Sequence, residues 1–408
     1  MTTAAPTFSL QERDRRWARI RAFMAERGLA GLVIAGLRSR DGFEPYVTNE
    51  SIQGVVVFPA DADPVHLTWN AFRILGRDDP GNDREYWIDD IRAGLIGPGI
   101  VAALTGAGLA AERIGVVGLR NKSPMELEGY VPHATWSHVL EQLPGAVFVE
   151  VSLAFGLLMM QKGPAELAAA RHCARVGELA CAEMIEVTRA GIRESELYAA
   201  LTSIVYRAGL TFTQPGIVFR SGREILSWGP PEWGTGAVPP RTIGPGELVY
   251  AELMPCYGGI ETQQQMNVAT SPVDPEWRRL ADVARRSYDA GLEALKPGIT
   301  FTEMCAAMAV PVHEADCWSL SPLIHSVSPA CLLGTLHDGA EKVLGDQYPW
   351  LRTLPPWDDA VLTEGMLFSF EPNACRGRHR VNIGGTVAVG RSGAEELNTL
   401  PCRLHEVR

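Results

Sequence analysis

The chain has 408 residues, of which 46% are hydrophobic and 21% are charged, and its formal net charge at pH 7 is −11. This composition is typical of a globular protein long enough for more than one domain. The acidic balance and the lack of a long basic run argue against a nucleic-acid-binding surface.

The N-terminus and the cysteines predict a cytoplasmic protein. The opening residues, MTTAAPTFSLQERDRRWARIRAFM, contain no apolar signal core, and no apolar run in the chain reaches the length of a membrane span. The eight cysteines all follow residue 170 and form no CxxC pair. They are therefore expected to be reduced thiols, mostly buried, and not a disulfide framework or a zinc site.

Strand and helix patterns alternate in the first part of the chain. The expected elements are a helix at 9–28, strands at 31–36, 45–49, 54–59, 64–69, 113–118 and 146–151, and helices near 97–109 and 124–143. Such alternation favours an α/β domain. No glycine-rich phosphate loop follows any of these strands, so a nucleotide cofactor is not expected.

A different pattern begins near residue 160. Pro164 suits the first turn of an Ala- and Glu-rich helix that runs to about Val187. The expected elements that follow are a helix at 194–208, a strand at 216–222, a Trp-, Gly- and Pro-rich loop at 227–240, helices at 274–295 and after Gly298, and strands at 366–372 and 381–390. We therefore expect two domains, at 1–160 and 161–408.

The stretch from Glu247 to Asn267 predicts two strands joined by a turn at 255–259. Glu252 lies in the middle of the first strand, among apolar residues. Burying an unpaired carboxylate is costly, so Glu252 is expected to be paired or to serve in a site. The alternative is a solvated position on the polar face of a half-buried strand.

This hairpin resembles the creatinase/methionine aminopeptidase family, whose metallopeptidases read G-D-x-V-x-x-D-x-G at this place. GMLFSFEP (365–372) matches the family pattern G-M-x-x-x-x-E-P, and the step from Lys162 to Glu166 resembles the opening of the family's catalytic domain. The resemblance covers nearly the whole chain. It implies an α/β N-terminal domain, an α+β pita-bread (creatinase-like) C-terminal catalytic domain, and a homodimer.

The resemblance also places the positions at which the metallopeptidases hold two metal ions. The first Asp position is Glu252, and the bridging Asp, eleven residues later (252 + 11 = 263), is Gln263. The His position falls on His325, the first Glu position on Glu371, and the bridging Glu position on Gly384. Both bridging carboxylates are absent, so no metal ion and no cofactor are expected. The alternative is one ion held by Glu252, His325 and Glu371.

Two metal-free branches of the family, creatinase and ectoine hydrolase, are similar to this chain. Ectoine hydrolases share a Glu in the first ligand position with Cys-Tyr in the turn, here Glu252 and Cys256–Tyr257. The loop that holds the catalytic His of creatinase has no His here. The resemblance implies a metal-independent hydrolase of a C–N bond in a small amidine, guanidine or amide. His325 or Glu371 would be the base, and Glu252 would hold the cationic nitrogen.

Further residues are expected to bind the substrate. Trp228 near carboxylates suits a cationic group, and Gln265 falls where creatinase has a substrate-holding Glu. The predicted binding residues are Trp228, Gln263, Gln265, His337, Arg378 in the basic cluster 376–380, and Tyr46, which would serve the neighbouring subunit's pocket. The alternatives are packing of the Trp loop, surface positions for His337 and Arg378, and a core position at a strand end for Tyr46.

The expected partner is therefore a small zwitterionic or cationic metabolite, with no nucleic acid and no membrane. Three other functions remain open at this stage. These are a metal-dependent Xaa-Pro aminopeptidase-like peptidase, a lyase or cyclase of a small zwitterion, and a non-catalytic binding protein.

Overall fold

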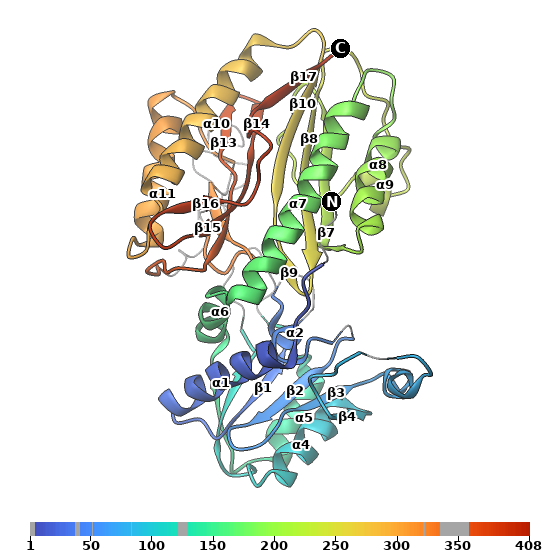
Figure 1. Ribbon diagram of the computed structural model, residues 1–408, viewed down its shortest axis with the longest axis vertical. Coiled ribbons are helices and arrows are strands. Elements are labelled where there is room, and N and C mark those ends of the chain that lie inside the picture. Colours follow the sequence, from blue (N-terminus) through green and yellow to red (C-terminus); the bar gives the residue numbers. More distant parts are fainter. Residues whose placement is uncertain are drawn as a thin grey trace. The chain divides into compact units, whose positions relative to one another are not determined.

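Figure 1 shows the computed structural model of the chain, which describes residues 5–36, 41–50, 52–82, 84–120, 129–320, 323–334 and 359–408. The chain divides into two compact units, Pro6–Met159 and Met160–Arg408. Among the described residues, no helix is long and apolar enough to cross a membrane.

The unit Pro6–Met159 is built around a sheet in which six described strands have the order β4-β3-β2-β1-β5-β6. Its elements are α1 (Leu10–Glu26), β1 (Gly31–Ala35), α2 (Phe43–Thr48), β2 (Val55–Pro59), β3 (Val65–Thr68), α3 (Ala71–Leu75), η1 (Gly76–Asp78), β4 (Asp90–Ala93), α4 (Ile96–Gly106), β5 (Arg113–Val117), α5 (His133–Gln142), β6 (Val147–Glu150) and α6 (Ser152–Met160). Helices cover both faces of the sheet (Figure 1), with α1, α2 and α6 packed on one face and α4 and α5 on the other.

The strand predicted at 45–49 is wrong, because residues 45–48 belong to helix α2 and Asn49 follows its last residue. The helix is flanked by Gly42 and Asn49, both in the left-handed backbone conformation, and this pair of turns limits it to six residues. Tyr46 and Val47 prefer strands, but here they are buried in the apolar core beside α1. Tertiary burial has therefore overridden the local preference.

The unit Met160–Arg408 contains a sheet of nine described strands, with the path β11-β12-β15-β10-β8-β7, and a separate pair, β13-β14. Its elements are α7 (Pro164–Val187), α8 (Glu194–Arg207), β7 (Thr211–Gly222), α9 (Glu232–Thr235), β8 (Leu248–Tyr257), β9 (Ile260–Glu261), β10 (Gln264–Thr270), α10 (Pro275–Ala294), α11 (Phe301–Glu314), β11 (Ile324–Ser326), β12 (Leu367–Phe370), β13 (Asn373–Arg376), β14 (His379–Asn382), β15 (Gly384–Val389), β16 (Ala394–Glu396) and β17 (Leu404–Val407). The predicted hairpin around Glu252 is confirmed as β8 and β10.

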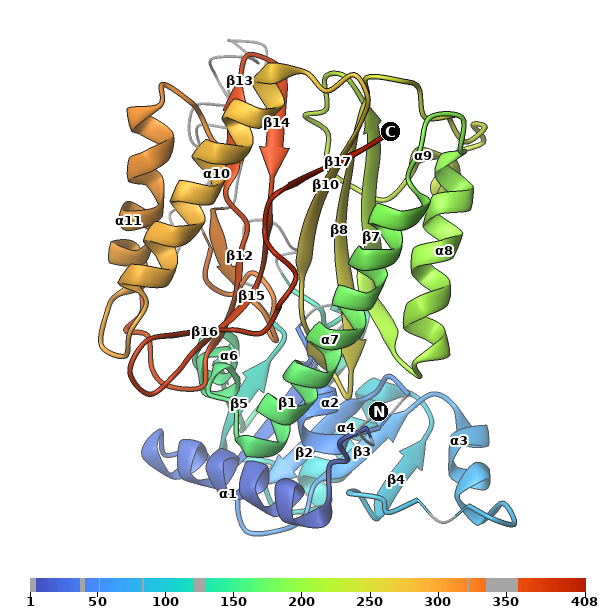
Figure 2. The same ribbon diagram turned by 45° about the horizontal axis from the view of Figure 1, so that its top comes forward.

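The alternation of side chains along β8 separates a core face from a second face. Val249, Ala251 and Leu253 pack in one apolar cluster with α7 and α8, which run beside β7 and β8 (Figure 2). Tyr250 and Met254 point the other way and form a separate small cluster with Val218. Glu252 lies between them in the strand, so its carboxylate is on the face opposite α7 and α8.

Candidate active site

The register of the sheet collects polar side chains on the face that carries Glu252. Glu252 is opposite Gln265 on β10, and Gln265 is opposite Gly384 on β15. Glu371 directly follows β12, the next strand of the sheet. Because directly opposed residues point to the same face, these positions form one row across four strands.

A second row lies beside the first. His325 on β11 is opposite Ser369 on β12, and Ser369 is opposite Thr386 on β15. The Thr386 hydroxyl exchanges hydrogen bonds with the backbone of Gln263, which donates to it at 2.7 Å and accepts from it at 3.1 Å. Sequence positions that lie far apart are thus brought into contact by strand pairing alone.

His325 and Glu371 form the centre of the site. His325 Nε2 lies 3.3 Å from Glu371 Oε1, and both side chains are at least 96% buried. The amide nitrogen of Gln265 donates to the other oxygen of Glu371 at 2.7 Å and lies 3.0 Å from the Ser369 hydroxyl. The same nitrogen lies 3.2 Å from Gln263 Oε1. The Gln265 amide and the His325 imidazole therefore hold the Glu371 carboxylate in place, and Gln263 contacts both of them.

The hydrogen-bond partners of His325 indicate that its ring is doubly protonated. Nδ1 lies 2.8 Å from the carbonyl oxygen of Ser326, which can only accept. Nε2 lies 3.0 Å from Gln263 Oε1. The orientation of this amide is assigned from its contacts, because Gln263 Nε2 donates to Glu261 at 2.6 Å and leaves Oε1 toward the imidazole. Each ring nitrogen thus faces an acceptor and needs a proton, which makes the ring an imidazolium.

The pKa of His325 is shifted in the same direction. Burial lowers it, but this effect is outweighed by the Cys331 sulfur, 3.6 Å from Nδ1, and by the Glu371 carboxylate. The net result is a pKa well above the ordinary 6.5. This direction favours the protonated ring that the hydrogen-bond partners indicate, and a positive charge on the ring compensates the Glu371 carboxylate.

A raised pKa in the folded state predicts how stability depends on pH. The contribution of protonated His325 is fully present below the unfolded-state pKa of about 6.5 and is lost as pH rises through the higher folded-state pKa. We therefore expect the difference in free energy of unfolding between the wild type and His325→Gln to shrink as the pH of urea titrations rises above about 6.5. His379→Gln, whose side chain is 32% exposed, is the control. A difference that grows with pH would contradict the imidazolium.

Glu252 has its own set of donors. The Trp228 indole N–H donates to Oε2 at 2.8 Å, and the Tyr250 hydroxyl donates to the same oxygen at 3.0 Å. Burial first, and then the Glu252 carboxylate, raise the pKa of Tyr250 well above its usual 10.0, so the phenol stays a neutral donor. The Arg380 guanidinium lies over the Tyr250 ring, 4.2 Å from its centroid. Trp228 itself is 44% exposed and so joins Glu252 to the surface.

The residues present do not fit the two-metal centre of the family. Gln263 is neutral, and a Cβ atom on Gly384 would lie 1.9 Å from the carbonyl oxygen of Phe370 and 3.0 Å from Gln265 Oε1. Gly384 therefore has no room for a bridging carboxylate, and the Gln265 amide lies beside it instead. Within the described residues, no group of three or more His, Cys, Asp or Glu side chains is placed to hold a metal ion.

The structure brings most of the predicted residues together. Glu252, Gln265, Gln263, His325 and Glu371 are linked by the register and contacts above, and Trp228 joins them through its N–H edge. The first strand of the hairpin is buried on both faces, so Glu252 is not on a solvated face.

Tyr46 and Arg378 have other contacts in the structure. Tyr46 is 4% exposed in the core of its own unit, where its ring packs on Phe155. Arg378 is exposed and pairs with Glu224 at 3.2 Å, outside these contacts. His337 lies outside the described residues.

Sequence reasoning missed two residues of this face, Tyr250 and Arg380. Tyr250 is two residues before Glu252 on the same strand, so the two-residue period of strand β8 gives a signal for it. Arg380 belongs to the basic cluster from which Arg378 was chosen. Only the strand pairing of β14 shows which of these side chains is buried.

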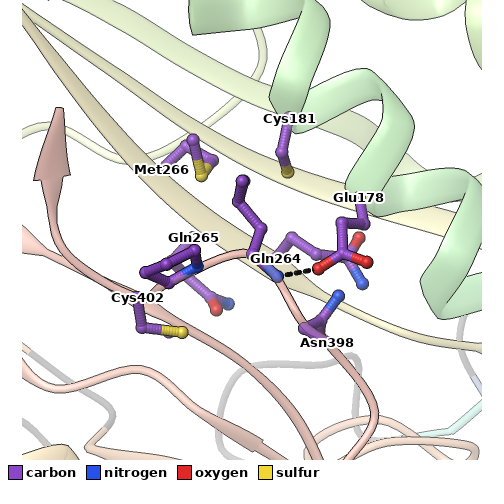
Figure 3. A pocket seen from close by; sticks show the side chains of 10 residues that line it. Glu178, Cys181, Gln264, Gln265, Met266, Asn398 and Cys402 are labelled. Atoms are coloured by element: carbon purple, nitrogen blue, oxygen red, sulfur yellow. Dashed lines mark hydrogen bonds between the residues drawn. The ribbon is translucent and has the colours of Figure 1, made fainter.

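A small pocket on the other side of the sheet is not this site. It lies next to α7 and is lined by Glu178, Cys181, Gln264, Gln265, Met266, Gly384, Asn398, Leu400, Pro401 and Cys402 (Figure 3). Its one carboxylate, Glu178, accepts hydrogen bonds from the Thr399–Leu400 segment. Burial raises the pKa of the Cys181 thiol above its ordinary value. The lining offers no acid–base pair.

Comparisons with known proteins identify the family of the chain. The sequence model of metallopeptidase family M24 matches residues 168–391, which is 224 of 408 residues (391 − 168 + 1 = 224). Creatinase from Bacillus sp. (strain B-0618) is 23% identical over 97% of this chain and 92% of its own length. Ectoine hydrolase from Halomonas elongata is 24% identical over 97% of this chain and 98% of its own.

A solved structure shows the same fold. Dipeptidase PepE from Mycobacterium ulcerans superposes with a TM-score of 0.73 at 18% identity, over 98% of this chain and 99% of its own. The predicted fold class, an α/β N-terminal domain with a pita-bread second domain, is thereby confirmed. The chain belongs to metallopeptidase family M24, as a hydrolase of that family.

Proposed function

We propose that this enzyme hydrolyses a C–N bond in a small amidine, guanidine or amide metabolite and does so without a metal ion. The observation that carries the proposal is the buried His325–Glu371 pair, held by Gln263 and Gln265 where a metallopeptidase would have bridging carboxylates. The positive charge of the His325 imidazolium compensates the Glu371 carboxylate. A divalent metal ion would therefore lack its bridging carboxylate ligands, and it would not be needed to neutralise Glu371.

The protonation of His325 divides the catalytic roles. The sequence left either His325 or Glu371 as the base, but an imidazolium has no lone pair with which to accept a proton. Glu371 is then the base, which takes a proton from the attacking water as the new C–O bond forms. His325 donates its Nε2 proton to the departing nitrogen as the C–N bond breaks, and the proton on Glu371 returns to the imidazole across the 3.3 Å contact.

The acceptors of the site favour a substrate rich in N–H groups. Glu252 carries a negative charge on the same row as Glu371, and Trp228 and Tyr250 hold one of its oxygens. Gln265 Oε1 is buried and has no hydrogen-bond partner among the described residues. An amidinium or guanidinium would supply donors to these acceptors, and its carbon would be the centre that water attacks.

Metal analysis with a paired turnover assay tests the proposal. The purified protein is expected to contain no stoichiometric metal ion and to keep its activity after chelation. Ammonia, urea or amine release from a panel of guanidines, amidines and amides identifies the reaction, with Xaa-Pro dipeptides as the comparison. One tightly held ion per chain, together with loss of activity on chelation, would contradict the proposal and favour a peptidase. The homodimer and the cytoplasmic location remain predictions.

A further inference from the structure

Arg380 is a buried cation whose charge is not paired within the described part of the chain. The residue is 3% exposed on strand β14, and it forms no ion pair with any residue in the described part of the chain. Its contacts are the face of Tyr250, 4.2 Å from Cζ, and the carbonyl oxygen of Leu226, 3.4 Å from Nη1. Nη2 is buried and has no hydrogen-bond partner among the residues that the structure describes.

A purely structural role does not account for this arrangement. Burying a guanidinium is strongly unfavourable unless its charge and its N–H groups are satisfied. One ring face and one long hydrogen bond leave Nη2 unsatisfied. Arg378, two residues earlier, shows the ordinary case, because it is exposed and paired with Glu224. Arg378 thus lies in solvent with an acidic partner, whereas Arg380 is buried and has no acidic partner among the described residues.

The position of Arg380 ties it to the candidate active site. Tyr250 lies beneath its guanidinium and donates a hydrogen bond to Glu252. One side chain, that of Tyr250, therefore connects Arg380 to Glu252. Asn382, two residues along β14, donates to the carbonyl oxygen of Glu371 at 3.3 Å. Asn382 Oδ1 is also buried without a partner in the described structure. The unsatisfied donor thus belongs to a residue that contacts Tyr250, and the unsatisfied acceptor to a residue that contacts the backbone of Glu371.

We propose that Arg380 is the oxyanion-binding residue of this site, which pairs through Nη2 with a carboxylate of the substrate. The nitrogen-bearing end of the substrate then lies at Glu252 and Glu371. A planar guanidinium held flat on an aromatic ring presents its N–H groups in the fork that a carboxylate accepts. The substrate class becomes a small amino acid derivative that carries both a carboxylate and an N–H-rich centre. The inference rests on the proposed function for the reacting end, but the anion subsite stands on the contacts of Arg380.

The test compares two probes that differ only in charge, 4-guanidinobutyrate and its neutral amide, 4-guanidinobutyramide. Calorimetric titration of the wild type is expected to give at least about tenfold tighter binding of the carboxylate, the size typical of a charge-assisted hydrogen bond. Arg380→Met is expected to reduce this ratio to about one, and Arg380→Lys, which keeps the charge without the fork, to an intermediate value. Arg378→Met is the matched control and is expected to keep the wild-type ratio.

The same titrations in a Glu371→Gln background measure binding without turnover, and the turnover of the panel is measured with the wild type, so that the two proposals are tested separately. If no probe or panel compound is turned over but the carboxylate preference depends on Arg380, the proposed reaction fails and the anion subsite stands. If turnover occurs but both probes bind equally, the subsite is wrong. Failure of 4-guanidinobutyrate to bind the wild type, or a carboxylate preference that survives in Arg380→Met, also overturns it. Should Arg380→Met fail to fold, Arg380→Lys decides by the same ratio.

Discussion

Glu371→Gln is expected to lower kcat/KM by about 10²- to 10⁴-fold, the usual contribution of a general base. The substitution keeps the size of the side chain but removes the oxygen that takes the proton of water. It also removes the negative charge that stabilises the His325 imidazolium at 3.3 Å. His325 is therefore expected to lose its proton at a lower pH in the variant than in the wild type. This titration reports the loss of the negative charge, whereas kcat/KM reports the loss of the base.

Two measurements check this result. The first is kcat/KM on the substrate found by panel screening, with Glu224→Gln as the control because Glu224 is exposed and pairs only with Arg378 among the described contacts. The second is the pH titration of the His325 ring by NMR, which is expected to shift to lower pH in Glu371→Gln. A loss of activity below tenfold would assign the base to Glu252. An unchanged His325 titration would remove Glu371 as its counter-charge.

Much of the fold was predictable from local chemistry. Pro164 is the first residue of α7, and that helix ends at Val187, as the composition indicated. Strands β7, β8, β10 and β12 lie within or close to their predicted ranges. These elements have strong signals because their turns carry proline or glycine and their buried faces follow a clear period. The helix α2 had no such signal, and its residues favoured a strand.

The candidate site was only partly predictable. Glu252 and Glu371 stand out as acids in apolar strands, and the family pattern points to His325. The protonation state of His325 follows from the orientation of the Gln263 amide, which only the three-dimensional contacts reveal. Arg380 is equally hidden, because sequence shows a cluster of basic residues without showing which one the β13–β14 pair turns inward.

Gly384→Ala is expected to destabilise the fold strongly, by about 3 kcal/mol or more, the upper end for overpacking a close-packed site. The new Cβ would lie 1.9 Å from the carbonyl oxygen of Phe370, which is backbone and cannot rotate away. Phe370 pairs with Gly385 in the adjoining strand, so a shift that relieves the contact must separate β12 from β15. Glu371 follows Phe370 directly and would move with it.

Urea unfolding of Gly384→Ala measures the loss, with Gly393→Ala as the matched control in the same unit, where the nearest atom to the new Cβ is 3.7 Å away. The control is expected to lie within about 0.5 kcal/mol of the wild type. If Gly384→Ala is as stable as the control, the strands can separate easily, and a bridging carboxylate at this position becomes possible. A strong loss instead means that close approach of β12 and β15 is what positions Glu371 against His325. In that case the site requires glycine at position 384, because only a residue without a side chain lets β12 and β15 approach closely enough to bring His325 and Glu371 together. A bridging Glu at this position would prevent that approach.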